Sequence, residues 1–91
     1  MPDRQEIRKK VFHDLSVISG FDEGRIQETD ELESDLGLSS DMLGSLAPGF
    51  EVIAQAYNPG AVITKSECKK LGSVKQSVDL VFKRCTINRE E

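Results

Sequence analysis

The sequence predicts a single all-α domain, a small four-helix bundle of three long helices and one short helix, with a long ordered loop after the first helix. Three observations support this fold. A chain of 91 residues with 37% hydrophobic content suits one small core and leaves no room for a second. Apolar residues recur at helical spacing, and serine, threonine and glycine stand where these stretches begin and end.

The first helix is expected from Arg4 to Ser19. Its apolar residues recur at spacings of four, four and three, which places them in one stripe: Ile7, Val11, Leu15 and Ile18. Gly20 follows in the position where a glycine commonly ends a helix. The stretch therefore forms an amphipathic helix with one buried side.

An acidic loop is expected over residues 21–39, because this stretch has no sustained periodicity. It carries seven acidic residues against one base, Arg25. Its apolar residues should hold it against the core: Phe21, Ile26, Leu32, Leu36 and Leu38. Ordered loops of this length commonly have a function.

A second helix should begin near Ser39 or Ser40, because a serine side chain can accept hydrogen bonds from the first amide groups of a helix. It should extend to Tyr57. An interruption is expected at Pro48-Gly49, where proline lacks an amide hydrogen and glycine adds backbone freedom.

The short third helix is expected over Lys65–Leu71. Thr64 precedes it and Glu67 stands three residues later, which is the capping-box pattern. Gly72 should end this helix and Ser73 should cap the last one. The inward stripe of the last helix, before a polar tail over residues 86–91, comprises Val74, Val78, Val81, Phe82 and Cys85.

Two further groups of residues bear on the surface and the core. The expected core residues include Phe12, Val52, Ile53 and Val81. The C-terminal half is basic, and its basic residues are Lys65, Lys69, Lys70, Lys75, Lys83 and Arg84. We expect these residues to form a solvent-exposed surface of mixed charge. The alternatives are a second docking face and internal ion pairs with the acidic loop.

Charge and hydropathy exclude several classes of function. The net charge of -4 argues against nucleic-acid binding, which needs a basic face to neutralise phosphates. No apolar run approaches the roughly 20 residues that span a bilayer, and MPDRQEIRKK lacks the apolar segment of a secretion signal. We therefore expect a cytoplasmic protein without a membrane span. A monomer is a separate expectation.

The cysteines and the histidine do not form a recognisable reactive or metal-binding pattern. Cys68 and Cys85 are separated by sixteen residues, so free thiols in a reducing compartment are expected. His13 is the only histidine and lies far from both cysteines in the sequence. No metal site is expected.

The segment between the loop and the second helix reads Asp35-Leu36-Gly37-Leu38-Ser39-Ser40-Asp41. It follows an amphipathic helix and an acidic loop, and it places a serine three residues beyond the glycine. This order of features resembles an acyl carrier protein or a related phosphopantetheine carrier domain. The resemblance covers about residues 5–84, and Leu71-Gly72-Ser73-Val74 resembles the joint before the family's last helix.

The resemblance implies that the chain is a carrier and not an enzyme. Ser40 would bear 4'-phosphopantetheine, transferred from coenzyme A, whose thiol holds acyl or aminoacyl groups as thioesters. A helix start tolerates the new phosphodiester, since its amide groups and macrodipole favour an anion. The implied partners are a phosphopantetheinyl transferase and acyl- or aminoacyl-transferring enzymes, and the candidate partner contacts are Asp35, Asp41 and Glu51.

The segment departs from the family pattern on both sides of the serine. Ser39 replaces the family's aspartate, and Asp41 replaces its leucine. The stretch from Ser40 to Ile63 is also longer than usual for the family. The cargo stays open among fatty acyl, polyketide, aminoacyl and lipid-A-type groups.

Two placements of the extra residues are compatible with the resemblance. One places them within the second helix, over residues 46–49. The other places them before the modified serine, so that Gly44-Ser45-Leu46 supplies the serine-leucine pair and Ser45 is the attachment site. We favour Ser40, because its distance from Leu36-Gly37 is the more specific signal and preserves the capping geometry.

Other functions fit the same residues. Ser40 can be a plain helix cap, and the chain can be an unmodified carrier-like adaptor or regulatory subunit, which the altered serine flanks favour. A small enzyme or redox protein using Cys68 or Cys85 is the third alternative. It is the weakest, since no base stands beside either thiol in the sequence.

Overall fold

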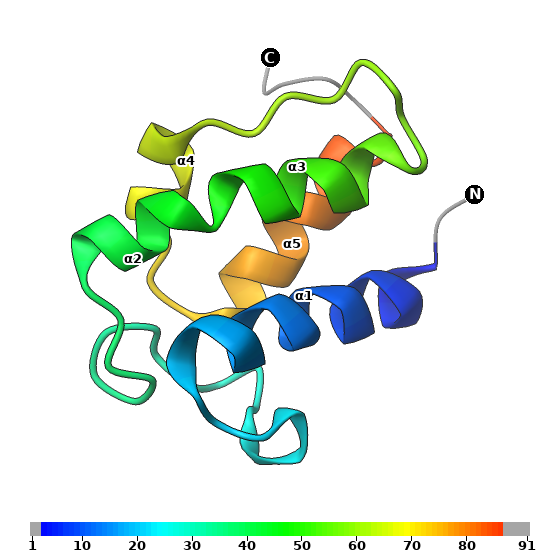
Figure 1. Cartoon of the computed structure of the whole chain (residues 1–91). Helices are drawn as coiled ribbons and strands as arrows, with labels where there is room; N and C mark the ends of the chain where they lie inside the picture. Colours follow the sequence, from blue (N-terminus) through cyan, green and yellow to red (C-terminus); the bar gives the residue numbers. More distant parts are fainter. Residues whose placement is uncertain (1–2, 87–91) are drawn as a thin grey trace.

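The computed structural model describes residues 3–86 as a helical bundle, which confirms the predicted fold class (Figure 1). Within this range the only β contact is an isolated bridge between Glu31 and Ser73. Beyond Thr86, the predicted polar tail lies outside the described residues. The helical elements in chain order are α1 (Arg4–Ser19), the 3-10 helix η1 (Glu23–Arg25), α2 (Ser40–Ser45), α3 (Ala47–Gln55), α4 (Lys65–Lys69) and α5 (Val74–Arg84).

The helix ends lie close to where the sequence places them. Gly20 has a φ of 82° and its amide donates to the Ser16 carbonyl, so a left-handed glycine ends α1 as predicted. Both halves of the capping box between Thr64 and Glu67 are present at the start of α4. The Ser73 side chain caps α5. These local signals hold because each depends on only a few neighbouring residues.

The second predicted helix is divided, but not at the predicted place. The break falls at Leu46, between α2 and α3, and not at Pro48-Gly49. Pro48 lies in the first turn of α3, where its missing amide hydrogen leaves no helical hydrogen bond unmade. Helix α3 therefore contains the proline in its first turn, and it ends at Gln55, two residues before the predicted end at Tyr57.

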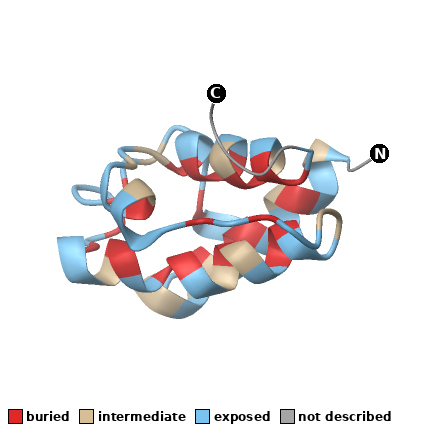
Figure 2. Ribbon diagram, turned by 90° about the horizontal axis from the view of Figure 1, so that it is seen from above, coloured by how far each residue is buried: buried red, intermediate tan, exposed pale blue. Residues whose placement is uncertain are grey.

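The core lies between the facing sides of the helices (Figure 2). Phe12, Ile53 and Val81 are buried as predicted, whereas Val52 is 67% exposed and was wrongly assigned to the core. The inward face of α3 is taken by Phe50, Ile53 and Ala54, so Val52 falls on the outer face of the helix. The side chains with no exposed surface include Ile7, Val11, Leu15, Leu32, Phe50, Val74, Val78 and Val81.

Four of the five apolar residues in the acidic loop anchor it to the core. Ile26, Leu32, Leu36 and Leu38 are buried, which confirms that the loop is tied to the bundle. Phe21 is the exception, because this residue is 38% exposed. Its backbone bonds to the Ser16 and Ser19 hydroxyls at the end of α1, and this arrangement leaves the ring at the surface.

The loop is also bonded through its backbone to the joint between α4 and α5. The Leu32 amide donates to the Gly72 carbonyl at 3.0 Å, and the Val74 amide donates to the Asp30 carbonyl at 3.0 Å. These bonds satisfy backbone groups that would otherwise lie unpaired beside the core. The loop that leads to α2 is thus fixed to the start of α5.

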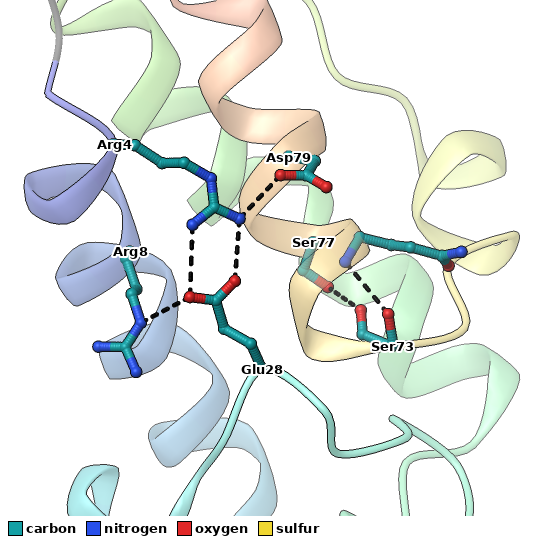
Figure 3. Close-up of polar contacts among 7 residues, drawn as sticks. Arg4, Arg8, Glu28, Ser73, Ser77 and Asp79 are labelled. Carbon is teal, nitrogen blue, oxygen red and sulfur yellow. Dashed lines mark hydrogen bonds and ion pairs between the residues drawn. The ribbon is translucent and has the colours of Figure 1, made fainter.

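A charged cluster ties the loop to α1 and α5 (Figure 3). The Glu28 carboxylate accepts hydrogen bonds from Arg4 at 2.9 and 3.3 Å and from Arg8 at 2.8 Å. Arg4 also donates to Asp79 on α5 at 2.8 Å. The hydrogen bond from Arg4, followed by that from Arg8, holds the pKa of Glu28 below its ordinary value.

Arg84 is buried, so the expectation that it belongs to a solvent-exposed basic surface is wrong. Its guanidinium pairs with Glu67 on α4, while its carbonyl accepts a hydrogen bond from the Asn58 side chain. Arg84 therefore has an internal charge partner, but this partner lies on α4 and not in the acidic loop. Pairing is required because an isolated buried cation is strongly unfavourable.

The contact between α1 and α3 buries one carboxylate oxygen. Asp14 Oδ2 is inaccessible to solvent and has no hydrogen-bond partner among residues 3–86. A Cβ atom on Gly49 would lie 2.8 Å from this oxygen, so the glycine leaves room for the Asp14 carboxylate between the two helices. Burial raises the pKa of Asp14, and the charge of His13 lowers it by less.

We expect Asp14→Asn to stabilise the protein by roughly 0.5–1 kcal/mol at neutral pH, since it removes a buried charge without changing the shape of the side chain. Because the pKa of Asp14 is raised in the folded protein, its ionised form destabilises the fold at pH values above the ordinary pKa of about 3.9. The gain in stability from Asp14→Asn should therefore vanish in acid. Urea unfolding as a function of pH measures the difference. Asp22→Asn removes an exposed loop carboxylate and should give no gain, whereas equal gains in the two variants would contradict the assignment.

We expect Glu28→Gln to destabilise the protein by about 1 kcal/mol at neutral pH, because charge-assisted bonds to two arginines are weakened. A lowered pKa means that the contribution of Glu28 is complete above about pH 4.3 and is lost as the pH falls through the folded-state pKa. Thermal unfolding at several pH values tests this. Glu33→Gln, an exposed loop variant, serves as the matched control, and identical pH profiles for both variants would refute the expectation.

Candidate functional site

The three serines of the segment differ in what their hydroxyl groups do. Ser39 is the cap of α2, and its Oγ accepts a hydrogen bond from the Met42 amide at 3.2 Å. Ser45 is the last residue of α2, and its Oγ donates to the Met42 carbonyl at 2.7 Å. Ser40 is the first residue of α2 and is exposed. Among residues 3–86 its hydroxyl has no hydrogen-bond partner.

The loop end before Ser40 is held in place on both sides of Gly37. Leu36 and Leu38 are buried, and the Leu38 amide donates to the Leu32 carbonyl at 3.0 Å. Gly37 has a φ of 71°, a left-handed conformation that favours glycine. The chain therefore reaches Ser40 from a fixed point two residues earlier.

Asp35 and Glu51, two of the predicted partner contacts, make structural hydrogen bonds. Asp35 is exposed, and its Oδ2 accepts from the Glu31 amide at 2.7 Å within the loop. Glu51 is half-buried, and its Oε2 accepts from the Ile63 amide at 3.0 Å. Glu51 thus holds the segment that leads into α4. Their role in partner binding stays a prediction.

Asp41, the third predicted partner contact, lies in a groove between α2 and α4. This groove has a volume of about 240 Å³ and also contains Ser45. The structure therefore places Asp41 and the reserve candidate Ser45 in one groove, whereas Ser40 is not part of its lining. The complete lining is Asp41, Gly44, Ser45, Lys65 and Lys69.

The sequence assigns the lysines of this groove only to the basic C-terminal half, with a second docking face as one alternative. Lys65 and Lys69 are four residues apart, a spacing that places both on one face of α4. The Lys69 stem packs against α2 at Gly44, where a Cβ atom would lie 2.9 Å from Lys69 Cε. The spacing of the lysines was visible in the sequence, but the approach of α2 was not.

A second groove lies between α1 and the junction of α2 and α3. It has a volume of about 310 Å³ and is mostly apolar, with Val17 72% exposed at its edge. Ser45 belongs to both grooves, so it lies between them. The residues around the second groove are His13, Asp14, Val17, Ile18, Ser45, Leu46 and Gly49.

Both thiols are buried, and neither forms a disulfide. Burial, with a smaller effect of the Glu67 charge, raises the pKa of Cys68 to about 11. Burial also raises the pKa of Cys85. A thiol that stays protonated and inaccessible at neutral pH is a poor nucleophile.

His13, the only histidine, is paired with an acidic side chain. Its Nδ1 lies 3.1 Å from Glu23 Oε2 at the surface. In the stretch from residue 3 to residue 86, no three histidine, cysteine, aspartate or glutamate side chains gather closely enough to hold a metal ion. No helix in the same stretch has the length and apolar character to cross a membrane.

Comparisons with known proteins add no relative to this description. No family model, no curated protein and no solved structure matches the chain. The resemblance to phosphopantetheine carriers therefore depends on the segment over residues 35–41 and on the order of the helices around it.

Proposed function

We propose that the chain is an acyl carrier protein, which holds acyl or aminoacyl groups as thioesters on a 4'-phosphopantetheine arm attached to Ser40. One observation carries the proposal: the exposed Ser40 hydroxyl, without a partner among the described residues, begins α2 directly after an anchored loop. The neighbouring hydroxyl groups of Ser39 and Ser45 are both engaged with Met42. This difference supports Ser40 over the reserve candidate.

The attachment reaction requires little of the carrier itself. Ser40 Oγ attacks the phosphorus of coenzyme A that bears the pantetheine, and the bond from that phosphorus to the adenosine bisphosphate breaks. The serine proton leaves to a base, which the phosphopantetheinyl transferase supplies. The carrier needs an accessible hydroxyl in a fixed place, and Ser40 meets both requirements.

The surroundings of Ser40 offer contacts of both charges to partner enzymes. The acidic loop over residues 21–39 would steer a basic enzyme face towards the start of α2. The partners we propose are the transferase and enzymes that load or remove acyl or aminoacyl groups, in the cytoplasm. A role in fatty acid biosynthesis or other lipid metabolism is included in this proposal.

A second candidate function is an unmodified carrier-like adaptor or regulatory subunit. The observation in its favour is the use of the Ser39 hydroxyl as a helix cap where the family has an aspartate. A second observation in favour of the adaptor is the division of the predicted helix at Leu46, which leaves α2 only six residues long. Such an adaptor would use the same surface without an arm.

Incubation with coenzyme A and a broad-specificity phosphopantetheinyl transferase should add one phosphopantetheine group to the protein. Ser40→Ala should abolish the addition, because it removes the nucleophile. Ser45→Ala should keep it, and this variant is the matched control because it removes an exposed hydroxyl of the same helix. Intact-mass spectrometry measures the change, and circular dichroism checks that each variant is folded.

Two results would change the conclusion. An unchanged mass of the wild-type protein with several transferases would refute the carrier function and favour the adaptor. Loss of the addition in Ser45→Ala but not in Ser40→Ala would move the attachment site to the end of α2.

A further inference from the structure

The groove between α2 and α4 carries more positive than negative charge. Lys65 and Lys69 contribute two ammonium groups, whereas Asp41 contributes one carboxylate. Among residues 3–86, neither lysine has a carboxylate within ion-pair distance. The groove is therefore a concave surface with an unneutralised positive charge, and it begins at the residue after Ser40.

The position of the lysines is set by the packing of α4. The Lys69 stem lies across Gly44, where a Cβ atom would be 2.9 Å from Cε and 3.6 Å from Cγ of the lysine. A stem that packs on a neighbouring helix keeps its ammonium group near that helix. On the other side of α4 from the two lysines, Glu67 pairs with Arg84 of α5. Glu67 also completes the capping box with Thr64. Helix α4 thus presents its lysines to α2 from a defined position.

We propose that this groove binds an anionic group of the arm carried by Ser40, through Lys65 and Lys69. The proposal rests on the proposed carrier function. The shared chemistry is a phosphate or carboxylate, which ammonium groups recognise by charge-assisted hydrogen bonds. It has two possible sources, the phosphodiester of the arm and the terminal carboxylate of a dicarboxylic acyl cargo.

Tethering makes such a site effective even though its lysines are exposed. Ion pairs at exposed lysines contribute about 1 kcal/mol or less each, so a free anion would bind only at millimolar or higher concentration. A flexible tether supplies an effective concentration of about the millimolar range. Attachment at Ser40 therefore raises the occupancy of the groove above that reached with the same anion free at micromolar concentration.

Nuclear magnetic resonance of four forms of the protein tests the proposal: unmodified, bearing the arm alone, and bearing the arm loaded with hexanoyl or with adipyl. The two acyl groups have the same chain length and differ by a terminal carboxylate. We expect the amide signal of Gly44 and the side-chain signals of the two groove lysines to shift on attachment of an anion. The shift should shrink at about 0.5 M salt, where charge interactions over more than a few ångströms are screened.

Attachment at Ser40 by itself shifts the Gly44 signal, because Gly44 lies four residues later in the same helix. The double variant Lys65→Gln, Lys69→Gln should abolish only the salt-sensitive part of the Gly44 shift. Lys75→Gln, which removes an exposed lysine of α5 outside the groove, should keep it and is the matched control. Amide signals of α1 and α3 report whether both variants stay folded. A salt-sensitive Gly44 shift of the wild-type size in the double variant would overturn the proposal.

The four forms of the protein also distinguish the two possible sources of the anion, the phosphodiester of the arm and the carboxylate of the cargo. Full salt-sensitive shifts with the arm alone assign the groove to the phosphodiester, whereas salt-sensitive shifts that need adipyl and are absent with hexanoyl assign it to the cargo carboxylate. If the arm attaches and none of the groove signals shows a salt-sensitive shift in any form, the anion site is refuted and the carrier function stands. If mass spectrometry shows no arm with any transferase, the carrier function itself fails, and the anion site fails with it.

Discussion

The docking of the acidic loop on the rest of the bundle is the constraint on which the other features depend. Glu28 accepts hydrogen bonds from Arg4 and Arg8 of α1, while backbone bonds join Leu32 and Asp30 to the start of α5. Seven carboxylates in one loop repel each other, so an anchor that pairs one of them with two arginines opposes that repulsion. Because this loop leads directly into α2, its anchors set the position of the helix start.

A second anchor fixes α4 and shows what a buried charge contributes. Glu67 uses Oε1 to accept the Thr64 amide and Oε2 to pair with Arg84. Arg84 Nε and Nη1 are buried and have no hydrogen-bond partner within the described part of the chain. Since desolvation offsets much of the attraction in such a pair, its main effect here is to define where α4 lies against α5.

How much of the fold follows from the sequence depends on the range of each interaction. The ends at Gly20, Thr64 and Ser73 were predictable, because capping involves residues within one helical turn. The exposure of Val52 and the burial of Arg84 were not. Val52 follows the rotation of α3 against its neighbours, and Arg84 depends on a partner seventeen positions away in the sequence.

The candidate site also combines features that the sequence predicts with features that only the packing of the helices reveals. The distance of Ser40 from Gly37 ranked it above Ser45 in the sequence, and the hydrogen bonding of the hydroxyl groups favours the same order. The lysines of α4 enter the proposed site only because the fold packs α4 beside α2, with the Lys69 stem against Gly44. An acidic loop therefore enters α2 at its first residue while two lysines line its side. Because like charges repel and opposite charges attract, this arrangement favours the α4 side over the loop side for an anion that would be attached at this helix start.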